Sequence, residues 1–134
     1  MTDGHGIPLG ALVTAGQSHE SMSFAALMDT VKIGRRRRPE AVAGDKGYSY
    51  RSVRTWLAER GIKGVIPTRC DQRRLKLDRE RYRRRNVVER CIGWLKCCRR
   101  VATRYEKLAT HFLGMVKLAM IQRCLRVLDP SNRT

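Results

Sequence analysis

Short apolar runs and helically spaced apolar residues alternate along the first third of the chain. The run from Ile7 to Thr14 lies between Gly6 and Gly16 and predicts a strand. From Ser21 onward apolar residues recur at helical spacing, which predicts a helix with Gly34 as its stop. The apolar positions of this helix are Met22, Phe24, Ala25, Leu27, Met28 and Val31.

A second strand is expected after a charged connection. This connection, residues 35–39, contains four consecutive arginines and a proline. The apolar residues 41–43 follow and predict a buried strand, and Gly44 and Asp45 come directly after it. The predicted strand therefore ends in a carboxylate.

The next elements repeat the order of helix and strand. Ser49 or Ser52 would cap a helix that ends at Gly61 and carries Val53, Trp56 and Leu57. Residues 64–67 then predict a short strand stopped by proline. Because strands alternate with helices, we expect parallel pairing through crossover connections, which is typical of the α/β class.

The second half of the chain is basic and helical. Between Arg69 and Arg100 there are thirteen Lys and Arg against four Asp and Glu. Residues 71–77 indicate a loop, residues 78–103 a long helix and residues 108–128 a second helix that is apolar nearly all round. The apolar face of the first helix would hold Val87, Val88, Cys91, Ile92, Trp94, Leu95 and Cys98.

The charge of the chain points to an acidic partner. The 134 residues carry a formal net charge of +17, and 42% of them are hydrophobic, so the composition is globular but strongly basic. Nucleic acid is the partner that this charge favours first. RNA is disfavoured, since only 6% of the residues are aromatic and no RNA-binding signature occurs.

Targeting and metal-thiolate patterns are absent from the sequence. The amino terminus lacks a basic region followed by an apolar run, and residues 112–128 are interrupted by charges, so neither a signal peptide nor a membrane span is expected. The five cysteines form no C-x2-C pair, and the three histidines are scattered. We therefore expect reduced thiols, no zinc site and a cytoplasmic location.

Two carboxylates are the candidates for chemistry. Asp45 follows a predicted strand, at the sheet edge where α/β proteins bind ligands, although it would equally cap a turn. Glu89 is the one acid between Arg81 and Val101, and an ion pair with Arg85 is the alternative to a functional role.

Helix geometry groups Glu89 with three other residues. At about 100° per residue, Tyr82, Arg85, Glu89 and Lys96 fall within a stripe about 60° wide on one helix. A carboxylate among cations suits a metal-bound phosphodiester, in which the acid binds Mg²⁺ and the cations bind phosphate oxygens. The phenol of Tyr82 would contact a phosphate or a base.

These residues resemble the DDE-type transposases of bacterial insertion sequences, in the branch with the signature Y-x2-R-x3-E-x6-K. The signature is similar to YRRRNVVERCIGWLK at residues 82–96. Four further blocks occur in the family's order, which are IPLGALVTAGQSHE, GDKGYS, VIPTR and RRVATRYEK. The resemblance covers nearly the whole chain.

The resemblance implies a ribonuclease H-like fold and metal-dependent DNA chemistry. It implies a truncated form of this fold, a short mixed sheet with flanking helices and two long carboxyl-terminal helices. We expect an α/β part at residues 1–67, a basic loop at 68–77 and a helical part at 78–134. In this family two aspartates and a glutamate bind two divalent cations, usually Mg²⁺, with Mn²⁺ as the substitute, and DNA is cleaved and joined at the element's ends. Asp45 and Glu89 would be catalytic and metal-binding residues. The DNA-binding residues would be Tyr82, Arg84, Arg85, Arg90 and Lys96.

One expected carboxylate has no counterpart. The family's first aspartate precedes the region where this chain begins, Asp3 aligns with a later turn, and Glu20 stands where an aspartate is common. We expect the carboxyl-terminal portion of a transposase, which is inactive alone. Its expected partners are double-stranded DNA and either an upstream transposase segment or a second copy of the chain, and no membrane partner is expected. The alternative is a non-catalytic DNA-binding protein that regulates or competes with a full-length transposase.

Overall fold

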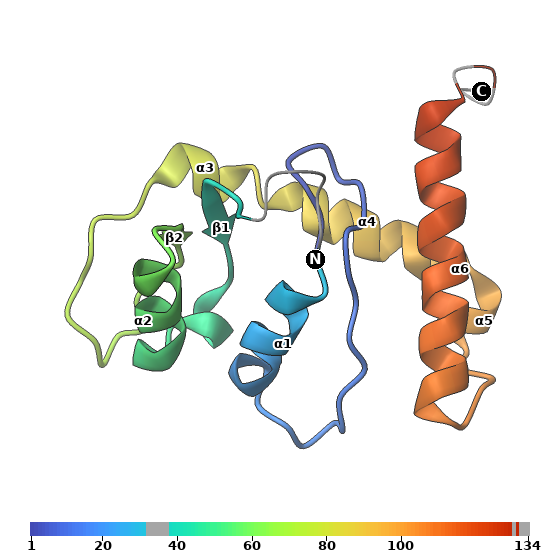
Figure 1. Cartoon of the computed structure of the whole chain (residues 1–134), viewed down its shortest axis with the longest axis horizontal. Helices are drawn as coiled ribbons and strands as arrows, with labels where there is room; N and C mark the ends of the chain where they lie inside the picture. The colour runs from blue at the N-terminus through green and yellow to red at the C-terminus, as the bar shows by residue number, and fades with distance from the viewer. Residues whose placement is uncertain (32–37, 130, 132–134) are drawn as a thin grey trace. The chain divides into compact units, whose positions relative to one another are not determined.

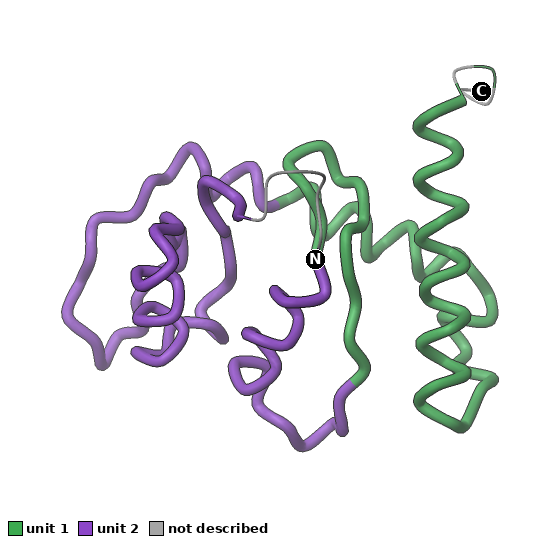
Figure 2. The backbone as a smooth tube through the Cα atoms, viewed as in Figure 1, with its two compact units in different colours: residues 1–13, 86–134 green, residues 14–85 purple. Residues whose placement is uncertain are grey.

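The chain folds into two compact units, which are coloured separately in Figure 2. The computed structural model describes residues 1–31, 38–129 and 131. Unit 1 comprises Met1–Val13 and Asn86–Thr134, and unit 2 comprises Thr14–Arg85. The expected division at residues 67 and 77 stays a prediction.

Unit 2 contains a parallel sheet. Strands β1 (Ala41–Ala43) and β2 (Lys63–Val65) pair in parallel, and helix α2 (Arg51–Glu59) lies between them in the sequence (Figure 1). Ala41 lies opposite Lys63 and Ala43 opposite Val65. The predicted strand, helix, strand order and its parallel pairing are confirmed, and the sheet of the described residues has these two strands. The exposure of β1 differs from the prediction, because its residues are half-buried or exposed.

The core of unit 2 lies between its helices and the sheet. The 3-10 helix η1 (Glu20–Ser23) leads into α1 (Phe24–Asp29), which confirms the first predicted helix, and its predicted stop at Gly34 lies outside the described residues. The ring of Phe24 meets that of Trp56 edge-on, with 5.5 Å between centroids. The core of unit 2 consists of Phe24, Met28, Val53, Leu57, Ile62, Val65 and Ile66.

Two glycines allow α2 to pack closely on the sheet. Gly61 has φ +64 and ends the helix as predicted, since this left-handed conformation favours glycine. A β-carbon at Gly64 would lie 3.1 Å from Cδ1 of Leu57, so a larger residue would push the helix away from β2. The close contact buries Leu57 almost completely.

The predicted cap of α2 is wrong. Tyr50 is the N-cap residue and makes no side-chain cap bond, and Ser52 lies inside the helix. Ser49 is 1% exposed, and its hydroxyl donates to Oε1 of Gln72 at 2.5 Å. A buried hydroxyl needs a partner, and here the loop after β2 supplies it.

Unit 1 begins with a turn instead of the strand predicted for residues 7–14. Oδ1 of Asp3 accepts hydrogen bonds from the backbone N–H groups of His5 and Ile7, both at 2.8 Å, and these bonds reverse the chain. The pairing that results is one antiparallel bridge between Thr2 and Pro8. Proline lacks an N–H donor, which prevents a longer ladder there.

The long helix predicted over residues 78–103 is also wrong. It is divided into α3 (Arg79–Arg83), α4 (Asn86–Cys97) and α5 (Arg99–Ala102), and α3 belongs to unit 2. The N–H of Arg85 donates to the carbonyl of Tyr82 at 3.0 Å, which is a tightened final turn. In a continuous helix Arg81 and Arg85 would repel each other one turn apart, so the break relieves like charges.

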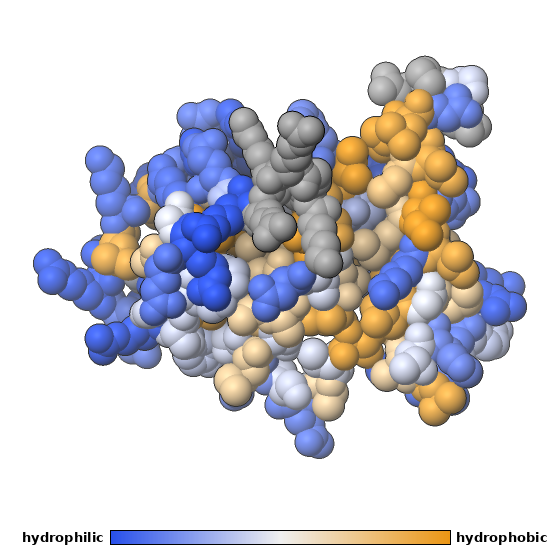
Figure 3. All heavy atoms as spheres, viewed as in Figure 1, coloured by the Kyte–Doolittle hydropathy of each residue, from blue (hydrophilic) through white to orange (hydrophobic). Residues whose placement is uncertain are grey.

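Helix α6 (Ala109–Leu128) confirms the last predicted helix but not its complete burial. Val116 and Ala119 are buried with Cys91 of α4 in the core of unit 1. Apolar side chains also gather on the outside of α6 (Figure 3), where those of Leu118, Ile121, Leu125 and Leu128 are more than half exposed. Within the described residues, every helix is too short or too polar to cross a membrane.

Candidate active site

Asp45 lies at the carboxyl end of β1, as predicted. The N–H of Gly44 donates to the carbonyl of Val65 at 3.3 Å, so strand pairing continues to the residue before Asp45. Asp45 is the N-cap of the 3-10 helix η2 (Lys46–Tyr48), and its Oδ1 accepts from the N–H of Gly47 at 2.9 Å. The turn-capping role is confirmed, and among the described residues Oδ2 accepts no hydrogen bond.

A second carboxylate lies beside Asp45. A β-carbon at Gly47 would be 2.9 Å from Oδ1 of Asp45 and 3.5 Å from Oε2 of Glu20. Both acids therefore border the space that the glycine leaves open. In the sequence, Glu20 stands out only as a change from an aspartate, whereas in the fold its position at the start of η1 brings it against η2.

The phenol of Tyr48 lies near the carboxylates of Glu20 and Asp45. Burial raises the pKa of Tyr48 first, and the negative charges of Glu20 and Asp45 raise it further. The ring is held by Phe24, with 5.8 Å between centroids. Two acids beside a half-buried phenol form an electronegative corner that attracts a cation.

Cationic residues border the same corner. Arg69 stacks over the ring of Tyr50 at 4.4 Å, and its Nε donates to the carbonyl of Lys46 at 3.2 Å. Gln72 fixes the loop of Arg69, because its Nε2 donates to the carbonyl of Ser49 at 2.9 Å. The two cations near Asp45 are Lys46, the next residue in the sequence, and Arg69, which bonds the backbone of Lys46 from the loop after β2.

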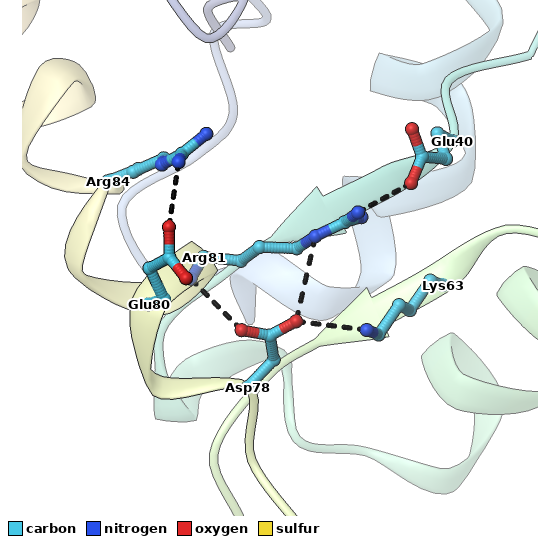
Figure 4. A network of polar contacts seen from close by, with 6 residues as sticks. All are labelled: Glu40, Lys63, Asp78, Glu80, Arg81 and Arg84. Atoms are coloured by element: carbon cyan, nitrogen blue, oxygen red, sulfur yellow. Dashed lines mark hydrogen bonds and ion pairs between the residues drawn. The ribbon is translucent and has the colours of Figure 1, made fainter.

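An ion-pair network fixes α3 to the sheet (Figure 4). Asp78 caps α3 through the N–H of Arg81 at 3.1 Å, and its Oδ2 accepts from Nζ of Lys63 in β2 at 2.9 Å. Arg81 also donates to Oε1 of Glu40, next to β1, at 2.6 Å. The hydrogen bond from Lys63 lowers the pKa of Asp78, and that from Arg81 lowers the pKa of Glu40.

The predicted DNA-binding residues of unit 2 lie on α3 and the turn after it. The guanidinium of Arg85 lies 5.4 Å from the ring centroid of Tyr82. Arg84 pairs with Glu80 at 2.8 Å, and both side chains are more than 70% exposed. An ion pair this exposed contributes little stability, so Arg84 can exchange Glu80 for another anion.

Glu89 and Lys96 lie on one face of α4, in its first and last turns. Seven residues of helix place them about 20° apart in direction and about 10 Å apart along the axis. Both are exposed, as is Arg90, whose Nη2 donates to Oδ1 of Asn86 at 3.4 Å.

The stripe of four residues predicted on one helix is therefore wrong. Tyr82 lies on α3 and Arg85 in the turn after it, in unit 2, whereas Glu89 and Lys96 lie on α4, in unit 1. Asp45 also belongs to unit 2, and its carboxylate neighbour is Glu20. Within unit 2 Arg85 lies over the ring of Tyr82, and within unit 1 Glu89 and Lys96 share one face of α4.

The donor chemistry suits a hard divalent cation. In the described ranges, no group of three or more His, Cys, Asp or Glu is gathered to hold a metal. The candidate ligands Asp45 and Glu89 offer carboxylate oxygens, which Mg²⁺ prefers to nitrogen or sulfur. Asp45 has one oxygen outside its cap bond, so it fits a cation without losing the turn.

Comparison with known proteins identifies the family. The sequence profile described as "Transposase DDE domain" matches residues 1–122. The chain is 31% identical over 140 residues to the Burkholderia cepacia protein "Putative transposase for insertion sequence element IS402". The match covers the whole chain and 64% of that relative, so the chain spans just under two thirds of its length. No solved structure matches the chain.

The family profile extends through β1, α2, β2 and α4, and therefore includes both candidate carboxylates. The chain therefore belongs to the DDE-type transposases of insertion sequences.

Proposed function

We propose that this chain forms part of an enzyme of DNA transposition, which cleaves DNA strands at the ends of an insertion sequence and transfers them to a target. The observation that carries this proposal is the position of Asp45, at the carboxyl end of β1 with Oδ2 outside the cap bond, within the region that matches the family. A ribonuclease H-like fold for the complete catalytic domain is part of the proposal.

Asp45 and Glu89 would bind the divalent cations, Mg²⁺ or Mn²⁺. When bound, such cations activate water and stabilise the charge that develops on the attacking and leaving oxygens. Lys96 shares the exposed face of α4 with Glu89 and would bind a phosphate oxygen of the DNA strand that is cleaved.

The remaining basic residues would position the DNA backbone. Arg85, stacked near Tyr82, and Arg84, in its exposed pair with Glu80, would bind phosphates from unit 2. Arg90 would do so from α4. Contacts of this kind fix the position of the duplex without selecting its sequence.

A third carboxylate is required, and Asp3 does not supply it. Its Oδ1 already accepts two backbone N–H groups, which is the role of a turn residue. We therefore propose that strand cleavage needs a segment equivalent to the part of the relative that this chain does not span. The chain alone is expected to nick DNA weakly.

Nicking assays test the proposal. Duplexes carrying the element's ends are incubated with Mg²⁺ or Mn²⁺ and with the chain, both alone and joined to the missing segment. Asp45→Asn and Glu89→Gln are each expected to abolish nicking by the joined protein. Glu59→Gln, at an exposed acid of α2, is the matched control and should keep full activity. Nicking that survives Glu89→Gln would refute the assignment.

The basic surface of the chain favours a second candidate, a DNA-binding protein without catalysis. Thirteen Lys and Arg against four acids between Arg69 and Arg100 suffice for binding whether or not a metal is held. Binding to element ends with no metal-dependent nicking by the joined protein would favour this regulatory or competing role.

A further inference from the structure

The loop between α5 and α6 presents an aromatic ring to solvent. Tyr105 is 62% exposed, whereas each of the other seven aromatic side chains of the chain is buried or half-buried. Aromatic rings normally contribute to stability by burial, and this ring lies outside both cores. The packing of the chain gives no reason for an aromatic residue at this position.

The loop is nevertheless firmly held on both sides of Tyr105. Before it, the N–H and hydroxyl of Thr103 donate to the carbonyl of Arg99 at 2.9 and 2.7 Å. After it, Glu106 is 17% exposed, and its Oε1 pairs with Arg100 of α5 at 3.3 Å. The ring is therefore carried by an ordered turn, which reduces the entropy that binding would cost.

The residue before Tyr105 is held in an unusual backbone conformation. Arg104 has φ +48, in the left-handed region, which is unfavourable for a residue with a β-carbon. Its guanidinium lies 5.4 Å from the ring centroid of Phe112 in α6 and so holds this conformation in place. Strain of this kind persists at functional sites when the surroundings enforce it.

Several cations lie close to Tyr105 in the sequence. Arg99, Arg100, Arg104 and Lys107 lie within six residues of Tyr105, against the single acid Glu106, which pairs with Arg100. An exposed aromatic ring among cations is the combination that binds nucleic acid strands with unpaired bases, since the cations attract phosphates and the ring stacks on a base.

We propose that Tyr105 stacks on an unpaired base of the DNA, at a nick or an opened end, while the neighbouring cations bind the adjacent phosphates. This inference rests on the proposed function in DNA transposition and adds a contact outside the carboxylate site. Stacking is tolerant of sequence, because every base has an aromatic face.

Binding to two probes tests the inference. One probe is an intact duplex, and the other is the same duplex with a short single-stranded gap that contains 2-aminopurine. Tyr105→Ala should weaken binding to the gapped probe by roughly five- to 150-fold and abolish the quenching of 2-aminopurine. Affinity for the intact duplex and its salt dependence should not change.

Three controls separate stacking from other roles. Tyr105→Phe keeps the ring and should bind both probes as the wild type does. Leu108→Ala removes an exposed apolar side chain, 59% exposed, at the same loop and should change neither affinity. Because the ring of Tyr105 is outside the core, the circular dichroism melting curve of Tyr105→Ala should match that of the wild type.

The outcomes distinguish this inference from the proposed function. If the wild type binds both probes and Tyr105→Ala binds the gapped one equally well, stacking is refuted and the proposed function stands. An equal loss in Tyr105→Phe and Tyr105→Ala would also refute stacking, because the ring would not be the group that matters. If the wild type binds neither probe, both proposals fail.

Discussion

Gly47 determines how the carboxylate of Asp45 is held. A β-carbon at this position would lie 2.9 Å from Oδ1 of Asp45, closer than such contacts occur. Gly47→Ala would therefore turn the carboxylate away and break its bond with the N–H of residue 47. Because φ at this residue is not positive, the backbone itself tolerates alanine.

The expected result of Gly47→Ala is a large loss of activity with a small loss of stability, about 1 kcal/mol for the one cap bond. Removing a group that orients a metal ligand typically costs 10- to 100-fold in metal affinity or activity, and we expect a loss in that range here. Nicking rates over a Mg²⁺ titration, together with thermal melts, measure the two effects. Gly16→Ala, where a β-carbon meets open space, is the control. Equal nicking by the two variants would contradict the role of Gly47.

At the scale of single elements, α4 contains a glycine that its packing does not explain. A β-carbon at Gly93 would meet no atom within 4 Å, and the backbone conformation there suits any residue. Gly93 lies about 40° from Glu89 and about 60° from Lys96 around the helix, on the face opposite the buried Cys91. Glycine permits close approach of a ligand to the helix backbone.

We expect Gly93→Ala to separate stability from function. Alanine should stabilise α4 by about 0.5 to 1 kcal/mol, because glycine carries that cost inside a helix. The added methyl group should also weaken DNA binding and nicking, since it lies beside Glu89 and Lys96 around the helix and between them along its axis. Gly114→Ala in α6, where a β-carbon is equally free of neighbours, should stabilise the chain with no effect on DNA. DNA binding by Gly93→Ala equal to that of the wild type would show that this face does not meet DNA.

The elements differ in how far the sequence predicts them. β1, α2, β2 and α6 follow from local patterns, because apolar spacing and the stop at Gly61 act within each segment. The breaks in the helix after residue 78 could not be predicted from periodicity, which continues across them. Arg81 pairs with Glu40, forty-one residues away, and a one-dimensional pattern does not contain that contact.

The candidate site shows the same limit. The position of Asp45 at a strand end is local, and it was predicted from residues 41–45 alone. The approach of Glu20 depends on contact between η1 and η2, so its proximity to Asp45 required the fold. The helical stripe failed for the opposite reason, because it assumed one continuous helix where the chain forms α3 and α4.

At the scale of the whole molecule, the net charge of +17 governs how the chain meets DNA. Whatever ion pairs form, the 12 Asp and Glu of the chain can neutralise at most 12 of its 29 Lys and Arg. The remaining positive charge must be balanced by solution ions or by a polyanion. Phosphates that replace solution ions make binding steeply dependent on salt, with a log–log slope near −0.9 for each contact.

The salt dependence of binding locates these phosphate contacts, because each lost contact makes the slope shallower. If six or more phosphates are bound, affinity for duplex DNA should fall by roughly 10³ or more between 50 and 200 mM salt. Arg90→Gln, on the exposed side of α4, should weaken binding to all duplex sequences alike and make the slope shallower by about 1. Arg51→Gln, at an exposed arginine of α2, should leave the slope unchanged, because it lies outside the basic region. If both variants make the slope shallower by the same amount, the charge acts as a diffuse field, and binding does not depend specifically on the basic region.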